Sequence, residues 1–93
     1  MRPKNYRAIV LYCLERHPRA RVLCNRNPCV NYGTDGILTQ NGIRRLRDLE
    51  IRTEAGAPIV GFHDHPDHMW IAPEFEEMVQ HCHDAGWLKI RTR

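Results

Sequence analysis

The sequence contains no serine and only two lysines, and both scarcities bear on function. Without serine, the nucleophilic turn Gly-x-Ser-x-Gly is excluded, and there is no glycine-rich phosphate-binding loop either. No apolar run approaches the roughly 20 residues that cross a bilayer. The basic start of the chain leads into no small-residue cleavage site, so we expect no signal peptide, no membrane partner and a cytoplasmic location.

Because lysine is so scarce, nearly all of the positive charge is arginine. The 93 residues carry 14 Lys and Arg against 11 Asp and Glu, a formal net charge of +3, and only Lys4 and Lys89 are lysine. The planar guanidinium group suits two-pronged contacts with phosphate and with guanine. An arginine-rich, mildly basic chain therefore favours a nucleic-acid partner, although a GC-rich genome would enrich arginine in the same way.

The length fits one small domain, residues 1–93, with a thin core. The four cysteines are Cys13, Cys24, Cys29 and Cys82. Without a secretory signal we expect reduced thiols rather than disulfides. A catalytic pair of Cys82 with His81 or His83 is rejected, because adjacent helical residues point apart and Cys82 belongs to an apolar face. We therefore expect no enzymatic activity.

The first segment, residues 1–18, predicts a helix. Asn5 is a suitable N-cap, and His17-Pro18 ends the helix because the residue before proline is pushed out of the helical region. The helical spacing of one buried face is met by Tyr6, Ile9, Val10, Cys13 and Leu14. Residues 19–38 predict a loop with at most a short helix, since Asn, Pro, Gly and Asp recur from Asn25 to Gly36.

Residues 39–56 predict a second long helix with Thr39 as its N-cap. Ile51 fits neither side of this helix cleanly, so the helix either kinks or ends near Glu50, or else it continues to Gly56 as its C-cap. At 100° per residue, Ile43, Leu46 and Leu49 lie on one side of this helix. The opposite side gathers Asn41, Arg44, Arg45, Asp48 and Arg52, with Arg47 at the flank. Asp48 would repel phosphate there unless a neighbouring arginine pairs with it.

Residues 57–72 predict a β-hairpin, because β-rich runs at 58–62 and 68–71 flank a turn-rich loop. A further helix is expected over 73–86, with proline and glutamates in its first turn and histidines near its end. Residues 87–90 are expected to be extended and to pair with an edge strand or cover the core.

The order of these segments resembles short winged helix-turn-helix proteins of phages and prophages, over about Thr39 to Gly86. The resemblance is carried by the run Ile43-Arg44-Arg45-Leu46-Arg47-Asp48-Leu49, a Gly-x-Pro-Ile step at 56–59, the pair Trp70-Ile71, and the acidic run from Glu74. It implies an α+β winged-helix fold, with three to four helices and a small antiparallel hairpin as the wing. It also implies binding of duplex DNA in replication, excision or transcription regulation.

In that fold, the helix over 39–56 would be the recognition helix in the major groove, with the wing against the DNA backbone. The predicted DNA contacts are Gln40, Asn41, Arg44, Arg45, Arg47, Arg52, His63 and His65. The alternative is a winged-helix module that binds a host or phage protein, using the acidic start of the last helix and Trp87.

The wing carries the string His63-Asp64-His65-Pro66-Asp67-His68, which fits the H-x-H-x-D-H motif of metallo-β-lactamase-fold hydrolases. The chain is too short for that fold, so the hydrolase interpretation is rejected. A local zinc site completed by Cys24, Cys29, His81 or His83 stays open as a third interpretation. Equally, the histidines can contact phosphate or the minor groove. No metal and no cofactor is expected.

Overall fold

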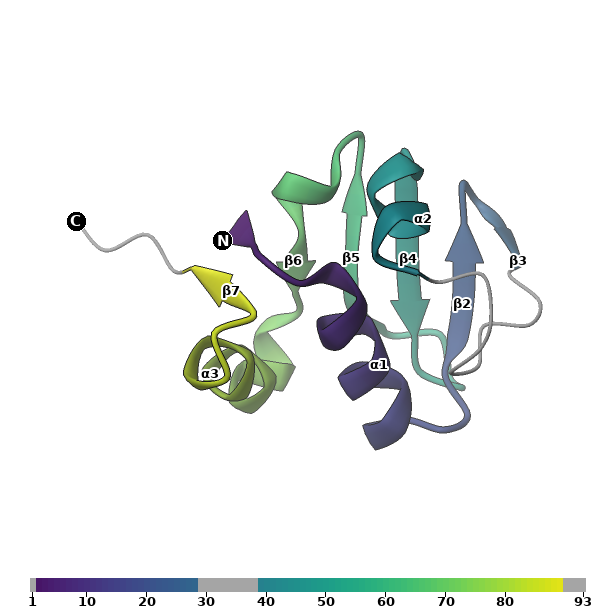
Figure 1. Ribbon diagram of the computed structural model, residues 1–93. Coiled ribbons are helices and arrows are strands. Elements are labelled where there is room, and N and C mark those ends of the chain that lie inside the picture. The colour runs from purple at the N-terminus through teal and green to yellow at the C-terminus, as the bar shows by residue number, and fades with distance from the viewer. Residues whose placement is uncertain (1, 29–38, 90–93) are drawn as a thin grey trace.

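A computed structural model describes residues 2–28 and 39–89 of the chain (Figure 1). The centre is a five-stranded antiparallel sheet in the order β3-β2-β4-β5-β6, and β1 pairs separately with β7. Because β4 has a partner on each side, the segment after residue 47 lies in the middle of the sheet. The strands are β1 Arg2–Pro3, β2 Arg21–Cys24, β3 Asn27–Pro28, β4 Asp48–Arg52, β5 Pro58–His63, β6 Trp70–Ile71 and β7 Leu88–Lys89.

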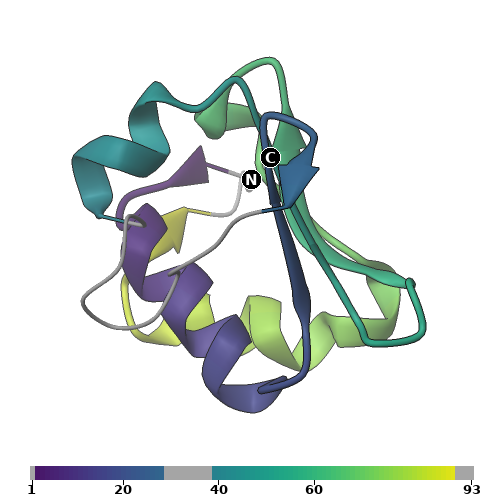
Figure 2. The same ribbon diagram turned by 90° about the vertical axis from the view of Figure 1, so that its right-hand side faces the viewer.

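The α-helices all lie on one side of the five-stranded sheet (Figure 2). Between them and the sheet lies the core, in which Ile9, Ile43 and Phe62 are fully buried. Within residues 2–28 and 39–89, no helix is both long and apolar enough to span a bilayer. The helices are α1 Tyr6–Arg16, α2 Gln40–Arg45 and α3 Glu76–Asp84, with 3-10 turns η1 Pro66–His68 and η2 Pro73–Phe75.

The winged-helix prediction is wrong, and the decisive segment is 39–56. Instead of one recognition helix, α2 ends at Arg45 and β4 begins at Asp48. Along β4, Leu49 and Ile51 are fully buried in the core, whereas the alternate positions point to the other face of the sheet. A period of two belongs to a strand. The ladders to β2 and β5 supply the backbone hydrogen bonds that a helix would have made locally.

The prediction of a loop or short helix over 19–38 is also wrong in its described part, where β2 and β3 form a hairpin. Its two turn residues, Asn25 and Arg26, have φ angles of 51° and 69°. Positive φ at both central positions is the conformation that continues the right-handed twist of two paired strands. Residues 29–38 of the predicted loop lie outside the described residues.

The hairpin predicted over 57–72 is present, but it is no wing. β5 and β6 pair antiparallel, with Val60 opposite Ile71 and Gly61 opposite Trp70. β5 is also paired along its other edge with β4, so the hairpin forms two strands of the main sheet rather than a projecting arm.

The helices predicted at the two ends of the chain are confirmed. The side chain of Asn5 accepts a hydrogen bond from the backbone N–H of Ala8, which caps α1, and His17 follows its last turn. At the other end, η2 leads directly into α3. The extended segment expected after it pairs, as β7, with β1.

Candidate functional site

The face of the sheet opposite the helices, called here the open face, is covered by no helix of the described part of the chain (Figure 2). Strand register brings together on it residues that are far apart in sequence. Asp48 lies opposite His63, and Glu50 lies opposite Gly61. Glu50 also has Leu23 as its partner on β2, and Gly61 has Trp70 on β6. The open face therefore mixes charged, imidazole and aromatic side chains over four strands.

Gly61 leaves room for the Trp70 ring on this face. A Cβ atom at position 61 would be 3.0 Å from Cζ2 of Trp70 and would overlap the carbonyl oxygen of Leu49. The indole therefore rests against the Gly61 backbone, with the His63 ring 5.9 Å away. One cross-strand row on the open face therefore runs from Leu23 through Glu50 and Gly61 to Trp70.

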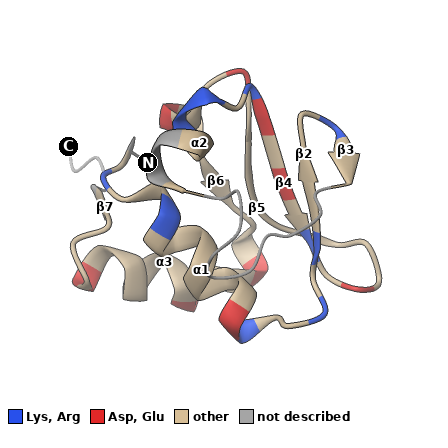
Figure 3. Ribbon diagram, turned by 45° about the vertical axis from the view of Figure 1, so that its right-hand side comes forward, with Lys and Arg blue, Asp and Glu red and all other residues tan. Residues whose placement is uncertain are grey.

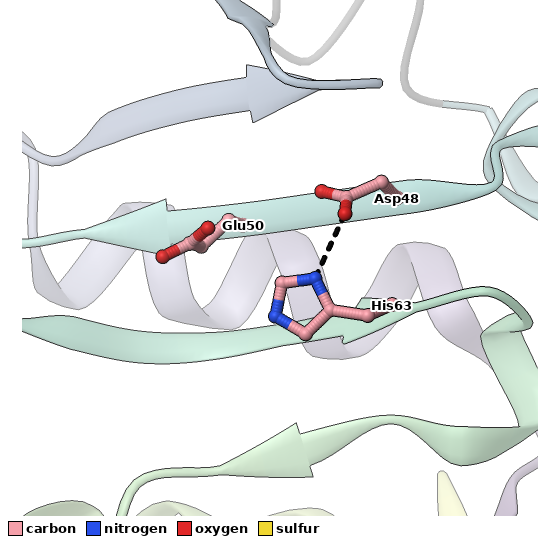
Figure 4. A group of neighbouring side chains, drawn as sticks. All are labelled: Asp48, Glu50 and His63. Atoms are coloured by element: carbon pink, nitrogen blue, oxygen red, sulfur yellow. Dashed lines mark hydrogen bonds and ion pairs between the residues drawn. The ribbon is translucent and has the colours of Figure 1, made fainter.

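On this face, Asp48, Glu50 and His63 form an acid–histidine cluster (Figure 4). Nδ1 of His63 is 2.8 Å from Oδ2 of Asp48, and one potential ligand atom from each residue lies within 4.8 Å of the others. The carboxylate side chains are only 12% and 14% exposed, whereas the imidazole is 54% exposed. Glu50 is ion-paired with Arg52, which also donates to the carbonyl of Gly56.

Asn25 fixes the end of the sheet at which this cluster lies. Its side-chain oxygen accepts hydrogen bonds from the backbone N–H groups of Arg47, at 3.0 Å, and of Asp48, at 3.2 Å. The backbone N–H of Asn25 donates to the backbone carbonyl of Asp48 at 2.8 Å. On the other side, the N–H of Asp64 donates to the carbonyl of Arg47. The β2–β3 turn, the α2–β4 link and the loop after β5 are thereby held together.

These hydrogen bonds place four exposed arginines around one end of the sheet. Arg26 lies in the β2–β3 turn, with Nε 3.9 Å from Oδ2 of Asp48. The others come from the last turn of α2 and the link that follows it. The arginine rim is Arg26, Arg44, Arg45 and Arg47.

Replacement of Asn25 by alanine is expected to cost about 1–3 kcal/mol of unfolding free energy. The change removes the acceptor for two backbone N–H groups and forces alanine into a left-handed φ of 51°. Urea denaturation measures the effect. Asn27→Ala is the matched control, because the Asn27 side chain makes one exposed hydrogen bond, and its loss should cost well under half as much. Equal losses would show that Asn25 does not hold the segments together.

The predicted DNA contacts fall into separate groups. Arg44 and Arg45 are exposed at the end of α2, Arg47 is exposed in the link, and His63 and His65 lie on the neighbouring β5 end and loop. The first turn of α2 contains Gln40 and Asn41, whose side chains lie outside what the structure describes.

Arg52 does not share a face with Arg44 and Arg45, as the helix prediction required. It lies at the far end of β4, about 13 Å from Asp48 at the rise of a strand. Asp48, which would have repelled phosphate on the predicted helix unless a neighbouring arginine paired with it, contacts His63 and the turn residue Arg26. The sequence reasoning missed Arg26 and Glu50 altogether.

The side chains of the string from His63 to His68 do not point toward one common site. His63 turns to Asp48, while Nδ1 of His65 accepts from the backbone N–H of Asp67 and caps η1. The Asp67 carboxylate accepts a hydrogen bond of 2.5 Å from the hydroxyl of Tyr6. Within residues 2–28 and 39–89, the group with metal-ligand geometry is Asp48, Glu50 and His63.

The other residues that the sequence offered as zinc ligands do not lie together with the string from His63 to His68. His81 stacks on Tyr12 with ring centroids 4.1 Å apart, and His83 lies beside Asp84. Cys24 is half-buried on β2, and Cys29 lies outside the described residues. Among the described residues, the cysteine–histidine zinc site has no geometric support.

Comparisons of the chain with protein-family models, curated proteins and solved structures find no match. What the protein binds is therefore inferred from its own side chains. Two features adjoin at the start of β4: the arginine rim and the acid–histidine cluster.

Proposed function

We propose that the protein binds duplex DNA, with the arginine rim contacting phosphates. The observation that carries this proposal is the gathering of four exposed arginines from two segments, the β2–β3 turn and the α2–β4 region, at one end of the sheet (Figure 3). Guanidinium groups bind phosphate with two parallel hydrogen bonds, and such contacts supply most of the affinity for a nucleic-acid backbone. The hydrogen bonds of Asn25 support a fixed spacing of these segments.

Nearby carboxylates cancel only part of this positive charge. Asp48 is 8% exposed, so its carboxylate is largely shielded from a ligand at the surface. Asp64 is exposed in the adjoining loop and lowers the local charge. The rim retains a net positive charge, which favours a polyanion.

The proposed contacts are to the backbone of DNA rather than to bases deep in the major groove. α2 has six residues, and Ile43 in its middle is fully buried. Among the described side chains of this short helix, the exposed ones are Arg44 and Arg45. Contacts of this kind position a protein on DNA with little information about sequence, so a weak sequence preference is expected.

The salt dependence of DNA affinity tests this proposal. With four phosphate contacts, affinity is expected to fall about 100-fold between roughly 50 and 200 mM salt, at a slope near −3.6. The triple variant Arg44→Ala/Arg45→Ala/Arg47→Ala is expected to reduce that slope to about −1. Fluorescence anisotropy with a labelled duplex gives both values.

The matched control removes arginines at the opposite end of the sheet. Arg16 ends α1 and Arg19 follows it, and both are exposed, so Arg16→Ala/Arg19→Ala lowers the net charge without touching the rim. This control is expected to keep the full slope. A wild-type affinity that is flat with salt, or equal losses in both variants, would overturn the proposal.

The protein-binding alternative keeps one supporting observation. Glu76 and Glu77 at the start of α3 are exposed, as that alternative requires. Trp87, however, is partly covered, because it packs edge-on against Tyr12 and His81 at 6.0 and 5.4 Å. Absence of any shift with duplex DNA, together with a specific protein recovered by this acidic surface, would favour the alternative.

A further inference from the structure

We propose that the acid–histidine cluster binds a first-row divalent metal ion, with Asp48, Glu50 and His63 as ligands. This proposal does not depend on DNA binding, since it rests on different side chains. It concerns the open face beside the arginine rim, where neighbouring strands present the three side chains together (Figure 4).

The strand backbone sets the positions of the ligands before any ion binds. Asp48 and His63 are directly opposite in the β4–β5 ladder, and Glu50 is two residues along β4, on the same face. Atoms bound to an ion at about 2.1 Å lie about 3.0–3.4 Å apart in octahedral or tetrahedral geometry. Oδ2 of Asp48 and Nδ1 of His63 are already 2.8 Å apart, and the whole set spans 4.8 Å. Because 4.8 Å exceeds the spacing of ligand atoms around one ion, the Glu50 side chain has to turn toward the other two ligands to complete the set.

Charge balance gives a second and separate reason for a cation. Two carboxylates on one strand face are largely removed from water, at 12% and 14% side-chain exposure. Glu50 has Arg52 as a close partner. Within the described part of the chain, the cationic partners of Asp48 are Arg26, whose Nε is 3.9 Å away and whose side chain is 88% exposed, and the imidazole of His63. A mostly buried carboxylate with such weak cationic partners is costly, and a bound dication would offset that cost.

The ligand types favour zinc or manganese over magnesium or calcium. One imidazole nitrogen with two carboxylate oxygens suits first-row transition ions, whereas magnesium and calcium prefer oxygen alone. Because His63 is half exposed, the remaining coordination positions would face solvent. The ion would take the place of the hydrogen bond that now joins His63 to Asp48.

Residues around the cluster already orient its ligands, as in established metal sites. Arg52 holds Glu50 from the far side and is itself anchored on the carbonyl of Gly56. The Trp70 ring lies beside the ligand His63, with ring centroids 5.9 Å apart. Such outer contacts fix side-chain rotamers and tune metal affinity.

Titration with Zn²⁺ and Mn²⁺, on protein purified without a histidine tag, tests the proposal. Calorimetry is expected to show one saturable Zn²⁺ site per chain, and Mn²⁺ is expected to broaden the amide signals of Asp48, Gly61 and His63 first. Asp48→Asn and His63→Gln should each weaken Zn²⁺ binding by at least about tenfold. Glu50→Gln serves as the third ligand variant if either of these fails to fold.

His65→Gln is the matched control, because it removes another exposed histidine only two residues away. If the string from 63 to 68 were the metal site, this change would abolish binding. The cluster proposal instead requires that it leave Zn²⁺ affinity unchanged within a factor of about two. No saturable binding in the wild type, or equal losses in His65→Gln and Asp48→Asn, would overturn the proposal. Neither result depends on whether the protein binds DNA.

Discussion

Replacement of Gly61 by alanine is expected to destabilise the protein by about 3 kcal/mol or more. The new Cβ would overlap the carbonyl oxygen of Leu49, a backbone atom of the central strand, and would press on the Trp70 ring at 3.0 Å. A flexible side chain can move aside, but a backbone carbonyl held in the β4–β5 ladder can do so only by distorting the pairing. For a domain whose total stability is about 5–15 kcal/mol, this is a large share.

Gly86→Ala is the control that separates this contact from the backbone freedom of glycine. Gly86 has a φ of +77°, and a methyl group added there would meet nothing within 4 Å, so its replacement should cost about 1 kcal/mol from backbone strain alone. Guanidinium denaturation of both variants gives the comparison. A Gly61→Ala variant no less stable than Gly86→Ala would contradict the close approach of β4 and β5.

Alkaline unfolding driven by two buried thiols is the second large expected effect. Burial raises the pKa of Cys13 to about 12, with a further contribution from Cys82, and burial raises the pKa of Cys82 to about 11. Both side chains are fully buried between α1 and α3. Between pH 9 and these values, the unfolded chain loses the thiol protons and the folded chain keeps them.

The stability contributed by the protonated thiols is therefore complete below pH 9 and is lost as pH rises toward 11–12. The expected slope approaches 1.4 kcal/mol per pH unit for each thiol, as an order of magnitude. Urea denaturation at a series of pH values from 8 to 11 measures it. Cys82→Ala should begin less stable at pH 8 and then decline less steeply, whereas parallel curves for the two proteins would contradict this origin.

The helices at both ends of the chain could be predicted because local sequence decides them. Asn5 caps α1 by a contact three residues away, and the apolar spacing from Tyr6 to Cys13 matches one buried face. Pro73 and the following glutamates mark the start of the last helical segment in the same way. Such signals lie within one or two turns and do not depend on the rest of the fold.

The prediction of one helix over residues 39–56 failed because the apolar residues there follow a helical spacing in one part and a strand spacing in the next. Residues from Ile43 to Leu49 fit a helix, but Leu49 and Ile51 alternate with Asp48, Glu50 and Arg52 as in a strand. The awkward place of Ile51 on the helical wheel was the visible sign of this change. β2 was missed for a related reason: four residues are too few to show a period, and the Asn25-Arg26 turn lacks the glycine that usually marks such hairpins.

Of the candidate site, the sequence predicted three arginines of the rim and, in the acid–histidine cluster, His63 as a DNA contact. Arg44, Arg45 and Arg47 are neighbours in sequence and stay neighbours in the fold. The acid–histidine cluster joins residues 15 apart through strand register, and register follows from pairing across the sheet, which the sequence does not display. Asp48 was unfavourable on a helix face proposed to bind phosphate. Because β4 is a strand, Asp48 instead lies in the acid–histidine cluster.

The most direct test of DNA binding at this end of the sheet is a duplex-DNA titration followed by amide and arginine side-chain NMR signals. The largest changes are expected in the arginine rim, at Arg26, Arg44, Arg45 and Arg47, and in the adjoining loop at His65. Signals of α3 and of Arg16 should stay in place. Saturating DNA that leaves the rim unchanged, or changes confined to α1 and α3, would contradict the proposed interface.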